Sequence, residues 1–428
     1  MSGVVMVQPI WGLEIRDLWL AISNLQSPRY NLVMFAINEP TISEQEIVRP
    51  TYVEVDLARL TDNYRAIVAA TQPASVMPIL KANAYGHGLV PVARHLASLG
   101  APYFGVAFLE EAIMLRQAGI ETPILVLGGI IGNQIPLFLQ YGLTLTASSV
   151  EKLRQIDAAA AQWGVRAKVH LKIDTGMERI GVHYYSAWEL LETAVTCRHT
   201  TVEGIYSHFA NADDLDLTSA RVQLARFNEV LGFYDENNLP RPPLCHIANS
   251  GAILQLPESH FNLVRAGILL YGVYPAADLP RTVPVRPALS WKSHVVYFKV
   301  VQPNHPVSYG STWQSDHLVR VVTVPVGYGD GYFRAMSGQA EVIIRGKRYP
   351  VVGRICMDQL MVNIEWETAY NGDGVLLLGE SGSATITVEE LASWANTIPY
   401  EILTNINTRV PRLYKGDLAK VEKTAVSR

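Results

Sequence analysis

The 428-residue chain has few cysteines, no run of basic residues and no long apolar segment. Its three cysteines, Cys197, Cys245 and Cys356, form no CxxC pair, which argues against a disulfide scaffold or a metal site. Reduced thiols are typical of the cytoplasm, where we expect the protein to be. Lysine and arginine number 35 against 39 acidic residues, a balance that argues against nucleic-acid binding. No stretch approaches the ~18 consecutive apolar residues of a membrane-spanning helix.

Residues 1–48 differ in pattern from the rest of the chain. Glu14 and Asp17 interrupt the first apolar stretch, so we expect no signal peptide. One apolar stripe has helical spacing and consists of Trp11, Ile15, Leu18, Ile22 and Leu25. A short docking helix is one interpretation of this stripe. We favour the other, a dispensable N-terminal extension.

From residue 51 onward, short β-prone runs alternate with segments of helical period. Eight such runs occupy residues 76–80, 103–108, 123–127, 143–146, 169–173, 202–207, 244–247 and 263–266. Nearly continuous apolar strands that alternate with helices are typical of a parallel sheet buried on both faces. Eight units in ~220 residues predict a closed (β/α)8 barrel of the TIM type, over residues 49–290. An open doubly wound sheet is the alternative, but no GxGxxG motif follows the first run.

The pattern changes after residue 290. Alternating strands are predicted at 293–300, 318–325, 340–344, 359–364 and 374–378, separated by turns rich in glycine and aspartate. One helix is predicted over 388–395, because Thr387 and Glu390 have the spacing of a capping box. We therefore predict a separate, mainly β domain over residues 291–428.

Several runs are followed by polar residues at their carboxyl ends, where enzymes with this barrel carry their chemistry. Lys81 directly follows the first run. At the barrel mouth its amine would lie against apolar surface, and desolvation favours the neutral, nucleophilic form. A lysine in that state can form a Schiff base with a carbonyl compound. A surface lysine that ends an ordinary strand is the alternative.

A phosphate site is predicted beside this lysine. Asn249 and Ser250 follow the seventh run, and Gly267 and Ile268 follow the eighth, and these strands commonly supply the phosphate site of such barrels. Tyr85 would add a hydroxyl group. A Schiff-base lysine that faces a phosphate site suggests pyridoxal phosphate or, alternatively, a sugar-phosphate aldolase.

With these residues in view, the chain resembles the alanine racemase family from residue 49 to residue 414. The strongest motif is KANAYGHG at 81–88, which resembles the family's cofactor-lysine signature. Further matches lie at 172–181, 206–210, 246–250, 307–310, 327–331, 353–358 and 409–412. The resemblance implies a pyridoxal 5'-phosphate enzyme that interconverts L- and D-alanine and supplies D-alanine for peptidoglycan.

The resemblance also implies roles for individual residues. Lys81 would carry the cofactor and act as one base, and Tyr309 would be the second base, supplied by the partner subunit of a homodimer. Arg179 and the backbone N–H of Met357 would meet the substrate carboxylate. The positions that match the rest of the family's cofactor site are Tyr85, His208, Asn249, Ser250, Arg265, Gly267 and Ile268.

Other matching positions concern access to the site and its surroundings. The narrow passage into the family's site is matched by Tyr328, Asp213, Arg334 and Arg354. Lys172 matches a lysine that is carbamylated in some members. Many relatives carry a phosphate-contacting tyrosine directly before Arg-Val-Pro-Arg, and this chain has Thr408 there.

Other functions remain as alternatives. A serine or broad-specificity racemase of the same family would share these motifs. A decarboxylase of the same build would carry an acidic residue facing the pyridine nitrogen, which Arg265 argues against. A non-catalytic cofactor-handling relative would consist of the barrel alone, which the segment 291–428 argues against.

Overall fold

The computed structural model describes residues 49–416 of the chain. The predicted extension 1–48 with its apolar stripe, and the last residues of the predicted β domain, 417–428, lie outside this range. Within it, no helix has both the length and the apolar character needed to cross a membrane.

Eight parallel strands form the predicted barrel, and each overlaps one of the predicted runs. Regular pairing joins β2 to β10, β3 to β4, and β5, β6, β8 and β9 in that order. Single bridges join Ile79 to Gly105 and Leu125 to Thr144, and the Arg265 amide donates to the Ala248 carbonyl at 3.0 Å, which completes the ring. The strands are β2 (Ser75–Pro78), β3 (Phe104–Val106), β4 (Ile124–Val126), β5 (Leu145–Ala147), β6 (Ala167–Asp174), β8 (Thr200–Tyr206), β9 (Leu244–His246) and β10 (Leu263–Ala266).

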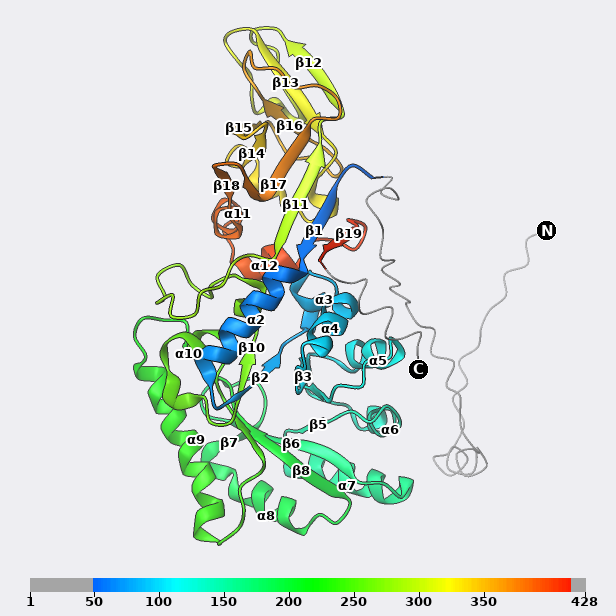
Figure 1. Ribbon diagram of the computed structural model, residues 1–428, viewed down its shortest axis with the longest axis vertical. Coiled ribbons are helices and arrows are strands. Elements are labelled where there is room, and N and C mark those ends of the chain that lie inside the picture. The colour runs from blue at the N-terminus through cyan, green and yellow to red at the C-terminus, as the bar shows by residue number, and fades with distance from the viewer. Residues whose placement is uncertain (1–48, 417–428) are drawn as a thin grey trace, which may run out of the picture. The chain divides into compact units, whose positions relative to one another are not determined.

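Helices lie around these strands, in green and blue in Figure 1. α7 (Val150–Trp163) shows why they form: the Ser149 hydroxyl accepts the Lys152 amide at 3.0 Å, and Gly164 ends the helix in the left-handed region. Its buried residues, Leu153, Ile156 and Ala160, share the face turned to the strands. The others are α2 (Leu57–Thr71), α3 (Lys81–Tyr85), α4 (Leu89–Ser98), α5 (Leu109–Gln117), α6 (Ile135–Gln140), α8 (Trp188–Thr196), α9 (Thr218–Glu236) and α10 (Ser250–Gln255).

One strand in the range predicted for the barrel pairs elsewhere. β1 (Tyr52–Asp56) is antiparallel to β11 (Leu289–His294) and parallel to β19 (Arg412–Lys415), so that the two ends of the described chain lie side by side, blue beside red in Figure 1. Val53 and Val55 are fully buried while their neighbours are half-buried. Such alternation suits a sheet with one buried face better than a barrel strand covered on both faces.

The C-terminal part is the mainly β sheet that the sequence predicts. Its strand order is β12-β13-β16-β15-β14-β17-β11-β1-β19, with β18 on β17. The sequence predicts a single strand at 293–300, but the structure has two there, because β11 ends at His294 and β12 begins at Tyr297. The remaining elements are β12 (Tyr297–Val301), β13 (Val319–Val324), β14 (Glu341–Ile344), β15 (Lys347–Val352), β16 (Leu360–Asn363), β17 (Gly374–Ser381), β18 (Ala384–Ile386), α11 (Val388–Ala395) and α12 (Pro399–Thr404).

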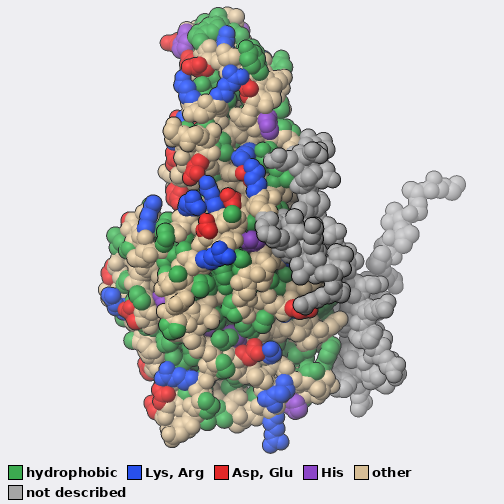
Figure 2. Space-filling view, in the orientation of Figure 1, with side chains coloured by type: hydrophobic (Ala, Val, Ile, Leu, Met, Phe, Trp, Pro, Cys, Tyr) green, Lys and Arg blue, Asp and Glu red, His purple; other side chains and the backbone are tan. Residues whose placement is uncertain are grey.

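The capping box of α11 is confirmed. The Glu390 amide donates to the Thr387 hydroxyl at 3.2 Å, and the Thr387 amide donates to the Glu390 carboxylate at 2.8 Å. The visible surface has mixed charge, since Figure 2 shows both basic and acidic side chains on it.

Candidate active site

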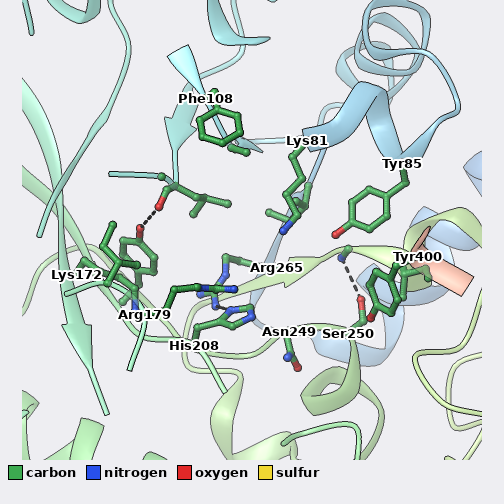
Figure 3. A pocket seen from close by; sticks show the side chains of 18 of the residues that line it. Lys81, Tyr85, Phe108, Lys172, Arg179, His208, Asn249, Ser250, Arg265 and Tyr400 are labelled. Carbon is green, nitrogen blue, oxygen red and sulfur yellow. Dashed lines mark hydrogen bonds between the residues drawn. The ribbon is translucent and has the colours of Figure 1, made fainter. Parts of the chain in front are cut away.

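A cavity of about 490 Å³ lies at the carboxyl ends of the barrel strands. Figure 3 shows its lining side chains, which come from several strands and from the loops that follow them. The structure brings the following sequence-predicted residues together in its wall: Lys81, Tyr85, Arg179, His208, Asn249, Ser250, Arg265, Gly267 and Ile268.

Lys81 begins a turn with unusual backbone geometry. Ala82, Asn83, Ala84 and Tyr85 all have φ between 52° and 56°, in the left-handed region. Non-glycine residues in this region cost roughly 1–2 kcal/mol each, so other contacts must hold the turn. Asn83 makes one such contact, because its side-chain oxygen accepts the Leu89 amide at 2.6 Å. The turn directs Lys81 and Tyr85 toward the same space (Figure 3).

The surroundings of Lys81 favour its neutral amine. Burial, and next the positive charge of Arg179, lower the pKa of Lys81 below its usual value. The charge of Glu111 opposes this lowering of the pKa but does not reverse it. Its carboxylate is engaged by backbone amides, accepting from Ala82 at 2.6 Å and from Ala107 at 2.8 Å. The structure therefore presents a lysine prepared to act as a nucleophile or a base.

Arg265 organises the cavity floor. A guanidinium only donates hydrogen bonds, so the Nδ1 atoms of His208 and His246, each 2.9 Å away, accept from it and both rings carry their proton on Nε2. His246 Nε2 lies 2.9 Å from Nδ1 of His170 and donates to it. Burial and then the charge of Arg265 hold the pKa values of His208 and His246 well below their usual range. The histidines are therefore neutral, and Arg265 is the cation of this group.

Lys172 lies beside this group. Burial, and next the charge of Arg265, lower its pKa to about 7. Its amine donates to the Ile173 carbonyl at 2.9 Å and lies 5.0 Å from the centre of the Tyr206 ring. Near neutral pH this amine changes charge inside the cavity wall.

Asp174 builds the turn that presents Arg179. One of its carboxylate oxygens accepts the Gly176 amide at 2.8 Å, and the other accepts the Arg179 amide at 3.1 Å. Burial alone would raise the pKa of Asp174, but these backbone hydrogen bonds lower it below its usual value. The resulting turn directs the Arg179 guanidinium into the cavity (Figure 3).

Opposite this turn, the predicted phosphate residues form a polar cradle. The Ser250 hydroxyl accepts the Gly267 amide at 3.1 Å. A Cβ on Gly267 would lie 2.8 Å from the Tyr85 hydroxyl, so glycine keeps this corner open. Asn249 uses its side-chain oxygen to cap α10, at 3.1 Å from the Ala252 amide, which leaves its NH₂ group for a ligand.

Tyr309 lies in a second cavity. It is 70% exposed and, together with Ser308 and Cys356, lines a cavity of about 590 Å³ in the C-terminal part. Met357 follows Cys356 in the C-terminal part, is 52% exposed, and accepts the Gly329 amide with its carbonyl at 2.9 Å. The residues predicted to act at one site thus fall into two groups within one chain.

The residues predicted for the access passage divide in the same way. Asp213 belongs to the barrel, and burial together with the charge of Asp213 raises the pKa of Tyr400. The other three lie in the C-terminal part: Tyr328 donates its amide to the Cys356 carbonyl at 3.0 Å, the Arg354 guanidinium packs at Gly310, next to Tyr309, and Arg334 begins a short 3-10 helix.

Both parts of the chain match known families of domains. Residues 55–275 match the model of the alanine racemase N-terminal domain, and residues 288–414 match the model of the C-terminal domain. The chain belongs to the alanine racemase family. The fold and the family predicted from the sequence are therefore confirmed.

Individual relatives cover nearly all of the chain's described range. The alanine racemase of Carboxydothermus hydrogenoformans is 44% identical over 86% of this chain and 100% of its own length. The solved alanine racemase from Streptomyces lavendulae superposes with a TM-score of 0.83 at 37% identity, covering 87% of this chain and 99% of that one. A histidine racemase from Leuconostoc mesenteroides gives a TM-score of 0.79 at 28% identity, covering 86% and 99%.

Sequence reasoning missed some residues of this alanine racemase cavity. Tyr400, from α12, lines it beside Tyr85, with ring centres 6.1 Å apart. Thr408, which stands where many relatives have a tyrosine, is exposed and does not line this cavity, whereas Tyr400 brings an aromatic hydroxyl to it. Phe108, which is 63% exposed, lies at the mouth and was also missed. Neither residue has a motif of its own, and only the fold brings them to the cavity.

Proposed function

We propose that the protein is an alanine racemase that uses pyridoxal 5'-phosphate. The observation that carries this proposal is a lysine with a lowered pKa, in one cavity with a permanently charged arginine and a glycine-lined polar cradle. The family membership supports the same reaction. The product, D-alanine, would serve peptidoglycan synthesis in the cytoplasm.

The residues present fit the cofactor. Lys81 would bond covalently to its aldehyde carbon, and the cradle would take its phosphate, with donors from Tyr85, Asn249 and Ser250 and the backbone at Gly267 and Ile268. The space that a Cβ on Gly267 would fill is available to a phosphate oxygen. Tyr400 would add a further hydroxyl on that side. His208 and Arg265 would meet the ring at its other end.

When bound, the cofactor supplies an electron-withdrawing ring that acidifies the substrate's Cα–H bond. Arg265 restrains that withdrawal. Its pKa, lowered to about 10 by burial, still leaves it charged at neutral pH, and it is fixed by donation to His208, His246 and the Ser207 carbonyl at 2.8 Å. A charged arginine does not readily give a proton to the pyridine nitrogen, which disfavours transamination.

Racemisation removes a proton from one face of Cα and returns a proton to the other. Two bases on opposite faces achieve this without a large movement. The Lys81 amine serves one face and the Tyr309 hydroxyl serves the other, while Arg179 and the Met357 N–H hold the substrate carboxylate. Because Tyr309 lines a different cavity of its own chain, a second copy delivers it, and the active unit is a homodimer with shared sites.

The domain organisation belongs to this proposal. Residues 49–290 would form the cofactor-binding barrel, and residues 291–428, of which the structure describes 291–416, would form the β domain that presents Tyr309. β1 is the exception, because it joins the barrel segment to the second sheet. Tyr328, Asp213, Arg334 and Arg354 would line the passage to the completed site.

Chiral product analysis tests the function. The purified protein with added cofactor is incubated separately with L-alanine, L-serine, L-lysine and L-histidine, and the enantiomers are separated by chromatography. We expect D-alanine to form fastest and only when cofactor is present. Faster formation of D-serine or D-histidine would reassign the substrate, and no D-amino acid with any substrate would refute the racemase.

A further inference from the structure

Arg412 is a buried cation that donates hydrogen bonds to four main-chain carbonyls. It belongs to the Arg-Val-Pro-Arg motif and lies at the start of β19, with 4% of its surface exposed. Its guanidinium donates to the carbonyls of Ile406 at 2.7 Å, Asn407 at 2.8 Å and Val410 at 2.8 Å. These bonds fold the segment before β19 around the side chain.

The fourth carbonyl lies in residues 81–88, the segment that begins with Lys81 and that we call the lysine loop. Arg412 Nε donates at 3.2 Å to the carbonyl of Gly86, the residue that ends the left-handed turn. The next carbonyl, that of His87, accepts the Tyr414 hydroxyl at 3.0 Å. Two side chains from β19 therefore bind two consecutive carbonyls directly behind the residues that line the cavity.

The same C-terminal segment packs tightly against the loop. A Cβ on Gly86 would lie only 2.1 Å from the Leu403 carbonyl in α12. α12 also carries Tyr400, which lies beside Tyr85 in the cavity wall. Residues 400–414 thus contact the lysine loop both in the cavity and behind it.

A left-handed turn of four non-glycine residues does not persist through local preference, so tertiary contacts must hold it. We propose that Arg412 is a positioning residue of the active site: its bond to the Gly86 carbonyl holds the left-handed turn, and with it Lys81 and Tyr85, in the geometry that binds the cofactor. The planar guanidinium can serve several carbonyls at fixed angles, which a lysine ammonium cannot do. This inference rests on the proposed attachment of the cofactor to Lys81.

The test compares Arg412→Met with a matched control, Arg116→Met. Arg116 is less deeply buried than Arg412 but, within the described residues, likewise donates to three carbonyls, those of Tyr141, Ile120 and Thr122 at 3.1, 2.6 and 2.8 Å, and it does not line the cavity. Both variants are expected to lower the melting temperature. Cofactor affinity is then measured by absorbance titration, and amide exchange of the peptide 80–89 is measured by mass spectrometry on cofactor-free protein.

We expect Arg412→Met to weaken cofactor binding by roughly tenfold or more and to speed exchange in 80–89, because the loss of a hydrogen bond to a charged donor releases the turn. Arg116→Met should change neither quantity. Arg412→Lys should recover part of the affinity, and Tyr414→Phe should cause a smaller loss of the same kind.

Equal cofactor affinity and equal exchange in the two methionine variants would overturn the positioning role and leave Arg412 as a stabilising residue. A separate measurement distinguishes a failure of this inference from a failure of the proposed function. Borohydride reduction of the wild-type holoenzyme, followed by peptide mapping, identifies the modified lysine. If another lysine is labelled, the cofactor assignment itself is wrong, whatever Arg412 does.

Discussion

Replacing Gly86 by alanine should lower the free energy of unfolding through two effects, backbone strain and steric overlap, and should also weaken cofactor binding. Gly86 has φ of +80°, so a Cβ there carries a strain of roughly 1–2 kcal/mol. The new Cβ would also lie 2.1 Å from the Leu403 carbonyl, and such an overlap with backbone adds about 1–3 kcal/mol as α12 shifts. The expected loss in the free energy of unfolding is therefore about 2–5 kcal/mol.

Gly100 provides the matched control. It has the same φ of +80°, but an added Cβ meets nothing within 4 Å. Gly100→Ala should cost only the strain, and the difference between the two variants in urea unfolding measures the steric part. Because α12 carries Tyr400, Gly86→Ala should also weaken cofactor binding, whereas Gly100→Ala should not. Equal losses in the two variants, with cofactor affinity unchanged, would refute the close packing of α12 on the lysine loop.

Three further expectations concern the cavity. Lys81→Ala should abolish the absorbance of covalently held cofactor and the racemase activity, and wild-type activity in this variant would contradict the assignment. The pKa of Lys172 is lowered to about 7 in the folded state from 10.5, so the unfolded chain binds more protons above pH 7. The free energy of unfolding should therefore rise with pH toward 10, by up to ~1.4 kcal/mol per pH unit. Lys172→Met should lose this rise in urea unfolding, and an unchanged slope in the variant would contradict the lowered pKa. Arg265→Glu should slow racemisation and raise transamination per turnover, and an unchanged product ratio would contradict the role of its charge.

The barrel could be predicted because its strands read as uninterrupted apolar runs. The end of the C-terminal sheet formed by β1 and β19 was harder to predict from the sequence. β1 has the same β-prone residues as a barrel strand, and in its pairing with β19 Val53 lies opposite Arg412, 359 positions away in sequence, so local pattern cannot decide which sheet it joins. The capping box at Thr387 is a local feature and was predicted correctly.

The lining of the candidate site was predictable where a polar residue directly follows a strand, as at Lys81, or belongs to a motif, as at Ser250. Tyr400 could not be found in this way, since nothing in its neighbourhood marks it and its place depends on how α12 packs. The left-handed turn was also beyond prediction, because Ala82, Ala84 and Tyr85 have no local preference for positive φ. Tertiary contacts impose that geometry.

Mixing two inactive variants tests the central claim, that Lys81 of one copy works with Tyr309 of another. Lys81→Ala and Tyr309→Phe are prepared separately, combined under conditions of verified subunit exchange, and assayed for D-alanine; each variant exchanged with itself is the control. Half of the dimers should be hybrids, each with one intact site, so activity should recover to roughly a quarter of the wild-type value. No recovery after complete exchange would contradict the shared site.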